Sequence, residues 1–137
     1  MTATPPDSGR SPFQYAIVRV VPSIERGEAV NAGIILFCRP RRYLRSRVGL
    51  DEAVVSALAP GWDAAGVRAH LASIPRICDG DDSEGPIARL SQPERFHWLV
   101  APSSTMVQPS AVHTGLTADP AGTLDHLFRT LVERSLT

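Results

Sequence analysis

The densest cluster of polar side chains lies in residues 25–31. Its members are Glu25, Arg26, Glu28 and Asn31. Two carboxylates beside an arginine and an amide can bind a divalent cation or act as general acid and base. The competing interpretation is structural: Gly27 forms a turn, Arg26 pairs with a glutamate at the surface, and Asn31 bonds to backbone. The sequence leaves both interpretations open.

A second group of polar side chains surrounds His113. Histidine is the usual acid or base near neutral pH, and Gln108 and Thr114 add an amide and a hydroxyl nearby. Together with the loop at 25–31, His113 could serve a hydrolytic or phosphotransfer enzyme. No Gly-x-Ser-x-Gly motif is present, and the four histidines lack HxxxH and HExxH spacing, so no metal or cofactor is expected. A structural or interface role is the favoured interpretation for His113.

Five arginines lie in residues 39–47. If this segment is a strand, Arg45 and Arg47 share one face with Tyr43. Such a face suits nucleic-acid phosphates and offers one ring for stacking. The alternative is that these arginines pair with the acidic residues between 79 and 84.

Arg19 is a single charge inside the apolar run at residues 15–21. A buried arginine must be paired, and Glu25 or Glu28 is the expected partner. Such a network would either support the strand or orient a binding site.

The composition excludes several mechanisms. All 14 basic residues are arginines, so no lysine can form a Schiff base or contact a nucleotide phosphate in a P-loop. Residues 15–48 are basic and residues 49–137 are acidic, although the net charge is zero. Cys38 and Cys78 lie in apolar runs and are predicted to be buried. The opposite charges of residues 15–48 and 49–137 permit an electrostatically guided contact within the chain or with a partner.

The chain shows no sign of membrane insertion or export. No apolar run approaches the roughly 20 residues that span a bilayer, and the first ten residues lack the apolar segment of a signal peptide. We therefore expect a cytoplasmic protein that does not enter a membrane.

The strands and helices predicted from the sequence, which must position these side chains, indicate an α+β fold. β-branched and apolar runs predict strands at 15–21, 30–38 and 42–48. Asp51, Asp63, Ser91 and Asp119 are each placed to cap a helix, and the last of these helices is amphipathic. We predict a small, mainly antiparallel sheet from residues 15–48, joined by strands from 104–116 and packed against helices. Residues 1–14 are predicted to be a disordered arm and residues 15–137 a single domain.

Two segments resemble a known bacterial family. Residues 15–38 read YAIVRVVPSIERGEAVNAGIILFC, and residues 94–116 read ERFHWLVAPSSTMVQPSAVHTGL. Both are similar to the bacterial domain of unknown function 3037, as is a closing helix around residues 124–128. The resemblance implies a bacterial cytosolic protein, often encoded beside a HipA-like kinase, and implies no activity.

Three functional hypotheses follow from these observations. The leading one is an accessory protein-binding module that works with a HipA-like kinase. The second is the hydrolytic or phosphotransfer enzyme, with Glu25, Glu28 and His113 as catalytic candidates. The third is a nucleic-acid binder that uses the arginines of 39–47. The binding candidates are Arg19, Arg26, Asn31, Arg45, Arg47, Gln108 and Thr114.

Overall fold

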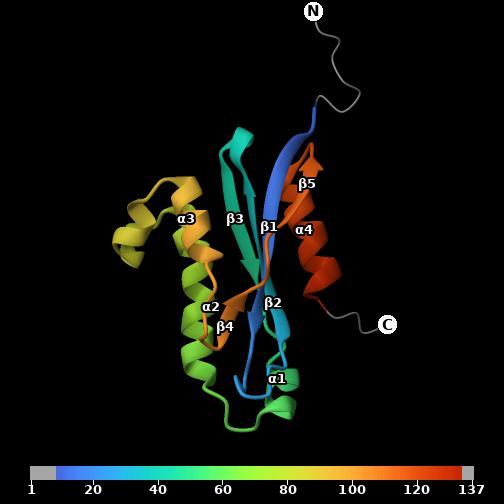
Figure 1. Cartoon of the computed structure of the whole chain (residues 1–137), viewed down its shortest axis with the longest axis vertical. Helices are drawn as coiled ribbons and strands as arrows, with labels where there is room; N and C mark the ends of the chain where they lie inside the picture. The colour runs from blue at the N-terminus through green and yellow to red at the C-terminus, as the bar shows by residue number, and fades with distance from the viewer. Residues whose placement is uncertain (1–8, 134–137) are drawn as a thin grey trace, which may run out of the picture.

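The computed structural model describes residues 9–133 and confirms the α+β class (Figure 1). The strands are β1 (Ser11–Val20), β2 (Val30–Cys38), β3 (Tyr43–Val48), β4 (Val107–Pro109) and β5 (His113–Thr117). The α-helices are α1 (Glu52–Leu58), α2 (Ala64–Asp79), α3 (Gln92–Leu99) and α4 (Pro120–Leu131). The short 3-10 turns are η1 (Arg39–Arg41), η2 (Asp82–Glu84) and η3 (Pro86–Arg89).

The first strand begins earlier than the sequence predicts. β1 starts at Ser11 rather than at Tyr15, so residues 11–14 belong to the sheet and not to an arm. The reason is the pairing with β5. In that pairing Thr117 lies opposite Ser11, so the strand continues to residue 11. The remainder of the predicted arm, residues 1–8, lies outside the described residues.

Every strand pairing in the sheet is antiparallel, as predicted, and β1 is its organising strand. The order is β3-β2-β1-β4, and β5 also pairs with β1. The ten residues of β1 therefore have β5 along their first half and β4 along their second half. The predicted contribution of residues 104–116 to the sheet is confirmed.

Helices cover both faces of the sheet. In Figure 1, α2 and α3 lie on one side of the strands and α4 lies on the other. One apolar cluster joins the sheet to α1, α2 and α3, and a second cluster joins it to α4. β2 contributes to both, since residues 32–38 are all buried. Burying a large aliphatic side chain stabilises a fold by about 1.5–3 kcal/mol, so β2 is the centre of the core.

The helix starts follow the predicted capping residues in three cases out of four. Asp51 accepts from the Val54 N–H, Asp63 accepts from the Gly66 N–H, and Ser91 forms a capping box with the glutamate three residues on. Asp119 occupies the N-cap position of α4, but its side chain makes no capping bond. There the Asp119 N–H donates to the hydroxyl of Thr117 instead.

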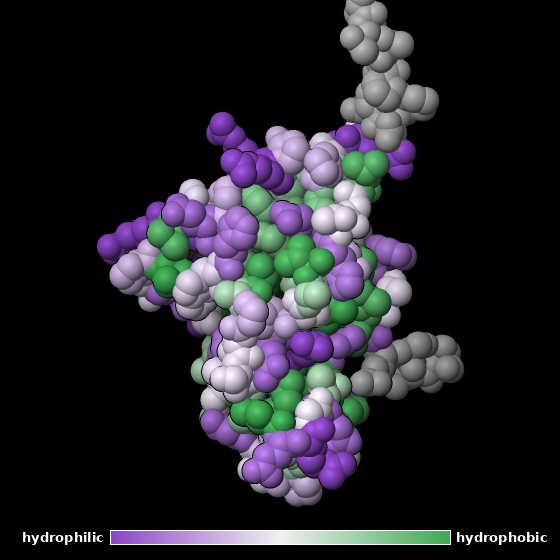
Figure 2. Space-filling view, viewed as in Figure 1, coloured by the Kyte–Doolittle hydropathy of each residue, from purple (hydrophilic) through white to green (hydrophobic). Residues whose placement is uncertain are grey.

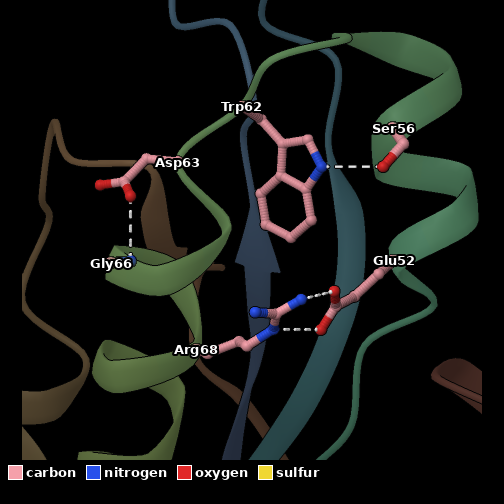
Figure 3. A network of polar contacts seen from close by, with 6 residues as sticks. All are labelled: Glu52, Ser56, Trp62, Asp63, Gly66 and Arg68. Carbon is pink, nitrogen blue, oxygen red and sulfur yellow. Dashed lines mark hydrogen bonds and ion pairs between the residues drawn. The ribbon is translucent and has the colours of Figure 1, made fainter.

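A polar network holds α1 against α2 (Figure 3). The guanidinium of Arg68 contacts both carboxylate oxygens of Glu52, with Nε to Oε2 at 2.7 Å. The indole N–H of Trp62 donates to the hydroxyl of Ser56 at 2.9 Å. These contacts join neighbouring elements at the surface, so the network is structural.

No helix within residues 9–133 is both long enough and apolar enough to cross a membrane. Cys38 and Cys78 are both buried, as predicted, and are free thiols.

Candidate functional site

Arg19 does not find the carboxylate partner that the sequence predicts. Its Nη2 donates to the Pro109 carbonyl at 3.2 Å, and its buried Nε has no hydrogen-bond partner among residues 9–133. In the sheet register Arg19 lies opposite Asn31 on one side and Gln108 on the other. The strand pairing thus fixes the guanidinium against backbone rather than in a charged site.

The amides of the two register partners are also engaged with backbone. Asn31 Nδ2 donates to the Leu131 carbonyl at 3.0 Å, which joins β2 to the last residue of α4. Gln108 Nε2 donates to the Thr105 carbonyl at 2.8 Å. The predicted backbone bond of Asn31 is therefore confirmed, and it connects segments distant in sequence.

The loop between β1 and β2 forms its own surface ion pair. Arg26 Nε lies 2.7 Å from Glu28 Oε1. This bond raises the pKa of Arg26 and lowers the pKa of Glu28. Gly27 has a positive φ of 76° at the turn, a conformation that glycine adopts at little cost. The predicted turn at Gly27 and the predicted surface pair of Arg26 with a glutamate are thus both present, and Glu25 is exposed beside them.

His113 lies on an exposed edge strand and stacks on an aromatic ring. Its ring centroid is 5.1 Å from that of Tyr15, which is its partner in the β1–β5 register. The nearby Ser110 hydroxyl accepts from the Ile17 N–H at 2.8 Å. Both side chains thus have contacts of a kind that holds strands together.

The structure does not bring His113 to the loop at 25–31. His113 pairs with Tyr15, whereas the loop follows the end of β1 at Val20. At about 3.3 Å per strand residue, those five positions separate the two groups by roughly 16 Å. Within residues 9–133, no three His, Cys, Asp or Glu side chains form a group that could hold a metal ion. The geometry gives no support to an enzyme built from these residues.

The arginines of β3 pair with acidic side chains from the helices. Arg45 Nη1 lies 2.7 Å from Asp79 Oδ1, and Arg47 Nη1 lies 3.1 Å from Asp125 Oδ1. The predicted pairing of this segment with the acidic half of the chain is confirmed for Arg45 and Asp79. β3 spans Tyr43–Val48, close to the strand predicted over 42–48, and residues 39–41 form the η1 turn before it, so only Arg45 and Arg47 of the five arginines lie in the strand.

A hollow of about 300 Å³ lies between α2, the end of α3 and β4, and no sequence pattern predicts it. Val18 and Ile35 line it from the sheet, and Trp98, which is 49% exposed, lines it from α3. His70 adds an imidazole, and partial burial lowers its pKa. The Ser73 hydroxyl donates to the carbonyl of residue 70 at 2.7 Å, so it is not poised as a nucleophile.

The outer side of β5 carries main-chain groups that no described strand pairs. The Ser110 N–H donates to the Ile17 carbonyl at 2.8 Å, so the odd-numbered residues of β1 direct their main-chain groups toward β4 and β5. The register pairs these residues with the odd-numbered residues of β5. Because main-chain groups alternate along an antiparallel strand, those of Thr114 and Leu116 point away from β1. This outer side, with Val112 beside it, is called the β5 edge below.

The two sides of the sheet differ in how they are protected. Val112 and Leu116 at the β5 edge are 37% and 51% exposed. β3, on the other side, carries the charged and ion-paired Arg45 and Arg47, which discourage pairing with another strand. Figure 2 shows hydrophobic surface between polar side chains over the middle of the molecule, where β1 runs in Figure 1. The β5 edge is thus the side of the sheet more open to a partner.

Comparison with known proteins gives one family. Residues 15–132 match the model of a family described as Protein of unknown function (DUF3037). No curated protein and no solved structure matches the chain.

Proposed function

The chain belongs to the family described as Protein of unknown function (DUF3037), and because that membership brings no activity with it, we propose that the chain is a protein-binding module. The observation that carries the proposal is the β5 edge. Its main-chain groups face outward, and no described element pairs them.

An extended segment of a partner can add to such an edge as a further strand. Main-chain hydrogen bonds then supply affinity, and alternate side chains supply specificity. On the β5 edge the outward groups belong to Thr114 and Leu116, and the exposed side chains of Val112 and Leu116 offer apolar contact. The contrast with the charged β3 supports this edge over the opposite one.

The partner that we propose is a HipA-like kinase, the neighbour that the family resemblance implies. It would supply an extended segment with apolar side chains. The contacts of Glu25, Glu28 and His113 support no competing enzymatic role, and the ion pairs of Arg45 and Arg47 weaken the case for nucleic acid.

Co-purification of the two proteins from one host tests the proposal. The variant Thr114→Pro removes an outward N–H that β1 does not use, whereas Thr114→Val keeps that N–H and serves as the matched control. We expect wild type and Thr114→Val to retain the kinase and Thr114→Pro to lose it. Circular dichroism verifies that both variants are folded.

Two results would count against the proposal, and they are distinguishable. Failure of the wild-type chain to associate with the HipA-like kinase removes that partner. Retention of the kinase by a folded Thr114→Pro variant leaves a binding module but shows that it does not use the β5 edge.

A further inference from the structure

A cationic hollow lies at the opposite end of β2 from the loop at 25–31. It has a volume of about 450 Å³, which is within the range of small-molecule sites. Its lining residues are Phe37, Arg39, Arg42, Ser91, Gln92 and Pro93. The hollow is therefore formed by the end of β2, the η1 turn and the first turn of α3.

Two of the arginines that line this hollow have no acidic partner in the described part of the chain. Arg39 and Arg42 are exposed, and neither side chain makes an ion pair or hydrogen bond among residues 9–133. Their neighbour Arg41 differs, since its Nε donates to the Ser11 hydroxyl at 3.0 Å. Within residues 9–133, Arg39 and Arg42 are thus the two arginines of the 39–47 segment whose side chains have no polar partner.

The backbone fixes the position of Arg42. Its φ of 51° is the only positive φ of a non-glycine residue among residues 9–133. The Gln92 side chain donates to the Arg42 carbonyl at 3.0 Å, which ties the turn to the start of α3. Glycine would adopt this conformation with less strain, so replacing Arg42 by glycine removes the guanidinium without disturbing the turn.

The positive charge of the hollow comes from the two arginines and not from the helix that begins beside it. Gln92 is the first residue of α3, but Pro93 has no N–H and the Glu94 N–H already donates to the Ser91 hydroxyl. The nearest carboxylate on α3 is Glu94, and it accepts from the Ser91 hydroxyl at 2.8 Å. Pro93 adds apolar surface next to the charges, and Phe37, itself 3% exposed, closes the inner end of the hollow. A ligand with one anionic group and a small organic body suits this combination.

We propose that this hollow binds a small phosphate monoester. The forked guanidiniums of Arg39 and Arg42 contact the phosphate oxygens, a geometry that arginine favours, and the organic body lies against Pro93. This site is separate from the β5 edge, so the proposal does not depend on the protein-binding function.

Calorimetric titration at low salt tests the proposal with three probes. AMP carries a phosphate on an organic body, inorganic phosphate is the head group alone, and adenosine lacks the phosphate. We expect AMP to bind, inorganic phosphate to compete with it, and adenosine not to bind. Absence of AMP binding, or equal binding of adenosine, would overturn the proposal. So would binding of inorganic phosphate without AMP, because the site would then have no place for an organic body.

Variants locate the site. Arg42→Gly removes the guanidinium and suits the positive φ, so we expect it to fold at least as well as wild type. It should bind AMP roughly tenfold more weakly, the effect of losing one strong charged hydrogen bond. Arg129→Gln removes an exposed arginine of α4 and is the matched charge control. An equal loss in both variants, or no loss in Arg42→Gly, would show that AMP does not use this hollow.

Discussion

The guanidinium of Arg47 lies over the ring of Phe128, with its Cζ 4.4 Å from the ring centroid. Arg47 is on the edge strand β3, and Phe128 is a buried residue of α4. The same guanidinium contacts Asp125 at 3.1 Å and Glu133 at 3.6 Å. One side chain thus connects the side of the sheet to the helix that covers it.

Replacing Arg47 should therefore loosen the contact between β3 and α4. We expect Arg47→Met to lower the free energy of unfolding by about 1 kcal/mol, because the cation–π contact is lost together with ion pairs that solvent already screens. Arg45→Met is the control, since Arg45 has only the exposed pair with Asp79, and its effect should be about 0.3 kcal/mol. Urea unfolding measures both, and equal losses would contradict the role given to Phe128.

A methyl group at Gly33 should disrupt the pairing of β2 with β3. A Cβ there would lie 2.9 Å from the Arg47 carbonyl oxygen and 2.9 Å from Val48 Cγ1. The first of these contacts is with backbone, which cannot rotate away, so we expect Gly33→Ala to destabilise the fold by about 2 kcal/mol. Gly9→Ala, where nothing lies within 4 Å of the added atom, should change stability by less than about 0.5 kcal/mol. Thermal unfolding that ranks the two variants equally would refute this steric argument.

Arg95 should stabilise the end of α2. Its Nη1 donates to the Leu90 carbonyl at 2.6 Å, and its Nη2 donates to the Cys78 carbonyl at 3.2 Å in the last turn of that helix. Arg95→Met removes both bonds and leaves the carbonyls without this donor, which should cost about 2 kcal/mol. Arg89→Met, at an exposed ion pair 3.5 Å long, should be nearly neutral in the same urea titration. If Arg95→Met is as stable as Arg89→Met, the carbonyl contacts do not hold α2.

The Cys78 thiol should be inert in the folded protein. Burial raises its pKa from 9.0 to about 12, so almost no thiolate forms at neutral pH, and the thiolate is the reactive species. We expect iodoacetamide to leave Cys78 unmodified at pH 8 and to modify it after unfolding in urea. Mass spectrometry of the peptide that contains Cys78 reads out the result. Modification at the same rate in both states would show that the thiol is accessible.

The same thiol should make the fold less stable in alkali. Above pH 9 the unfolded chain loses this proton first, while the folded chain keeps it until about pH 12. The unfolded state then binds fewer protons, so stability falls as the pH rises between those two values, by roughly 1–2 kcal/mol at pH 10. Comparing wild type with Cys78→Ala at pH 8 and pH 10 isolates this contribution. A difference that does not change with pH would contradict it.

The sequence predicted the elements of this fold better than their arrangement. The runs at 15–21 and 30–38, the caps at Asp51 and Asp63 and the capping box at Ser91 are local signals, and the structure bears them out. The start of β1 was predicted too late because its first residues become a strand through pairing with β5. That pairing joins segments far apart in the chain, so no periodic pattern in the sequence indicates it.

The candidate site was harder to predict for the same reason. Residue types indicated a surface pair between Arg26 and a glutamate, and the structure shows that the partner is Glu28. They could not show that Arg19 bonds to the Pro109 carbonyl, because the partner lies 90 residues away. The hollow beside Arg42 depends on a left-handed turn at a non-glycine residue. Such a conformation has no clear signal in a single sequence.

The pairing of β4 and β5 with β1 also determines the order in which the strands of the sheet can come together during synthesis. β1 and β2 are neighbours in sequence and can form a hairpin at once, but the Ser110–Ile17 and Asn31–Leu131 bonds span 93 and 100 residues. Contacts of such separation slow folding, since a long loop must close before they form. During synthesis the second side of β1 therefore stays uncovered until the last quarter of the chain leaves the ribosome. Over that interval the nascent chain exposes an apolar strand, the feature that makes folding intermediates prone to aggregate.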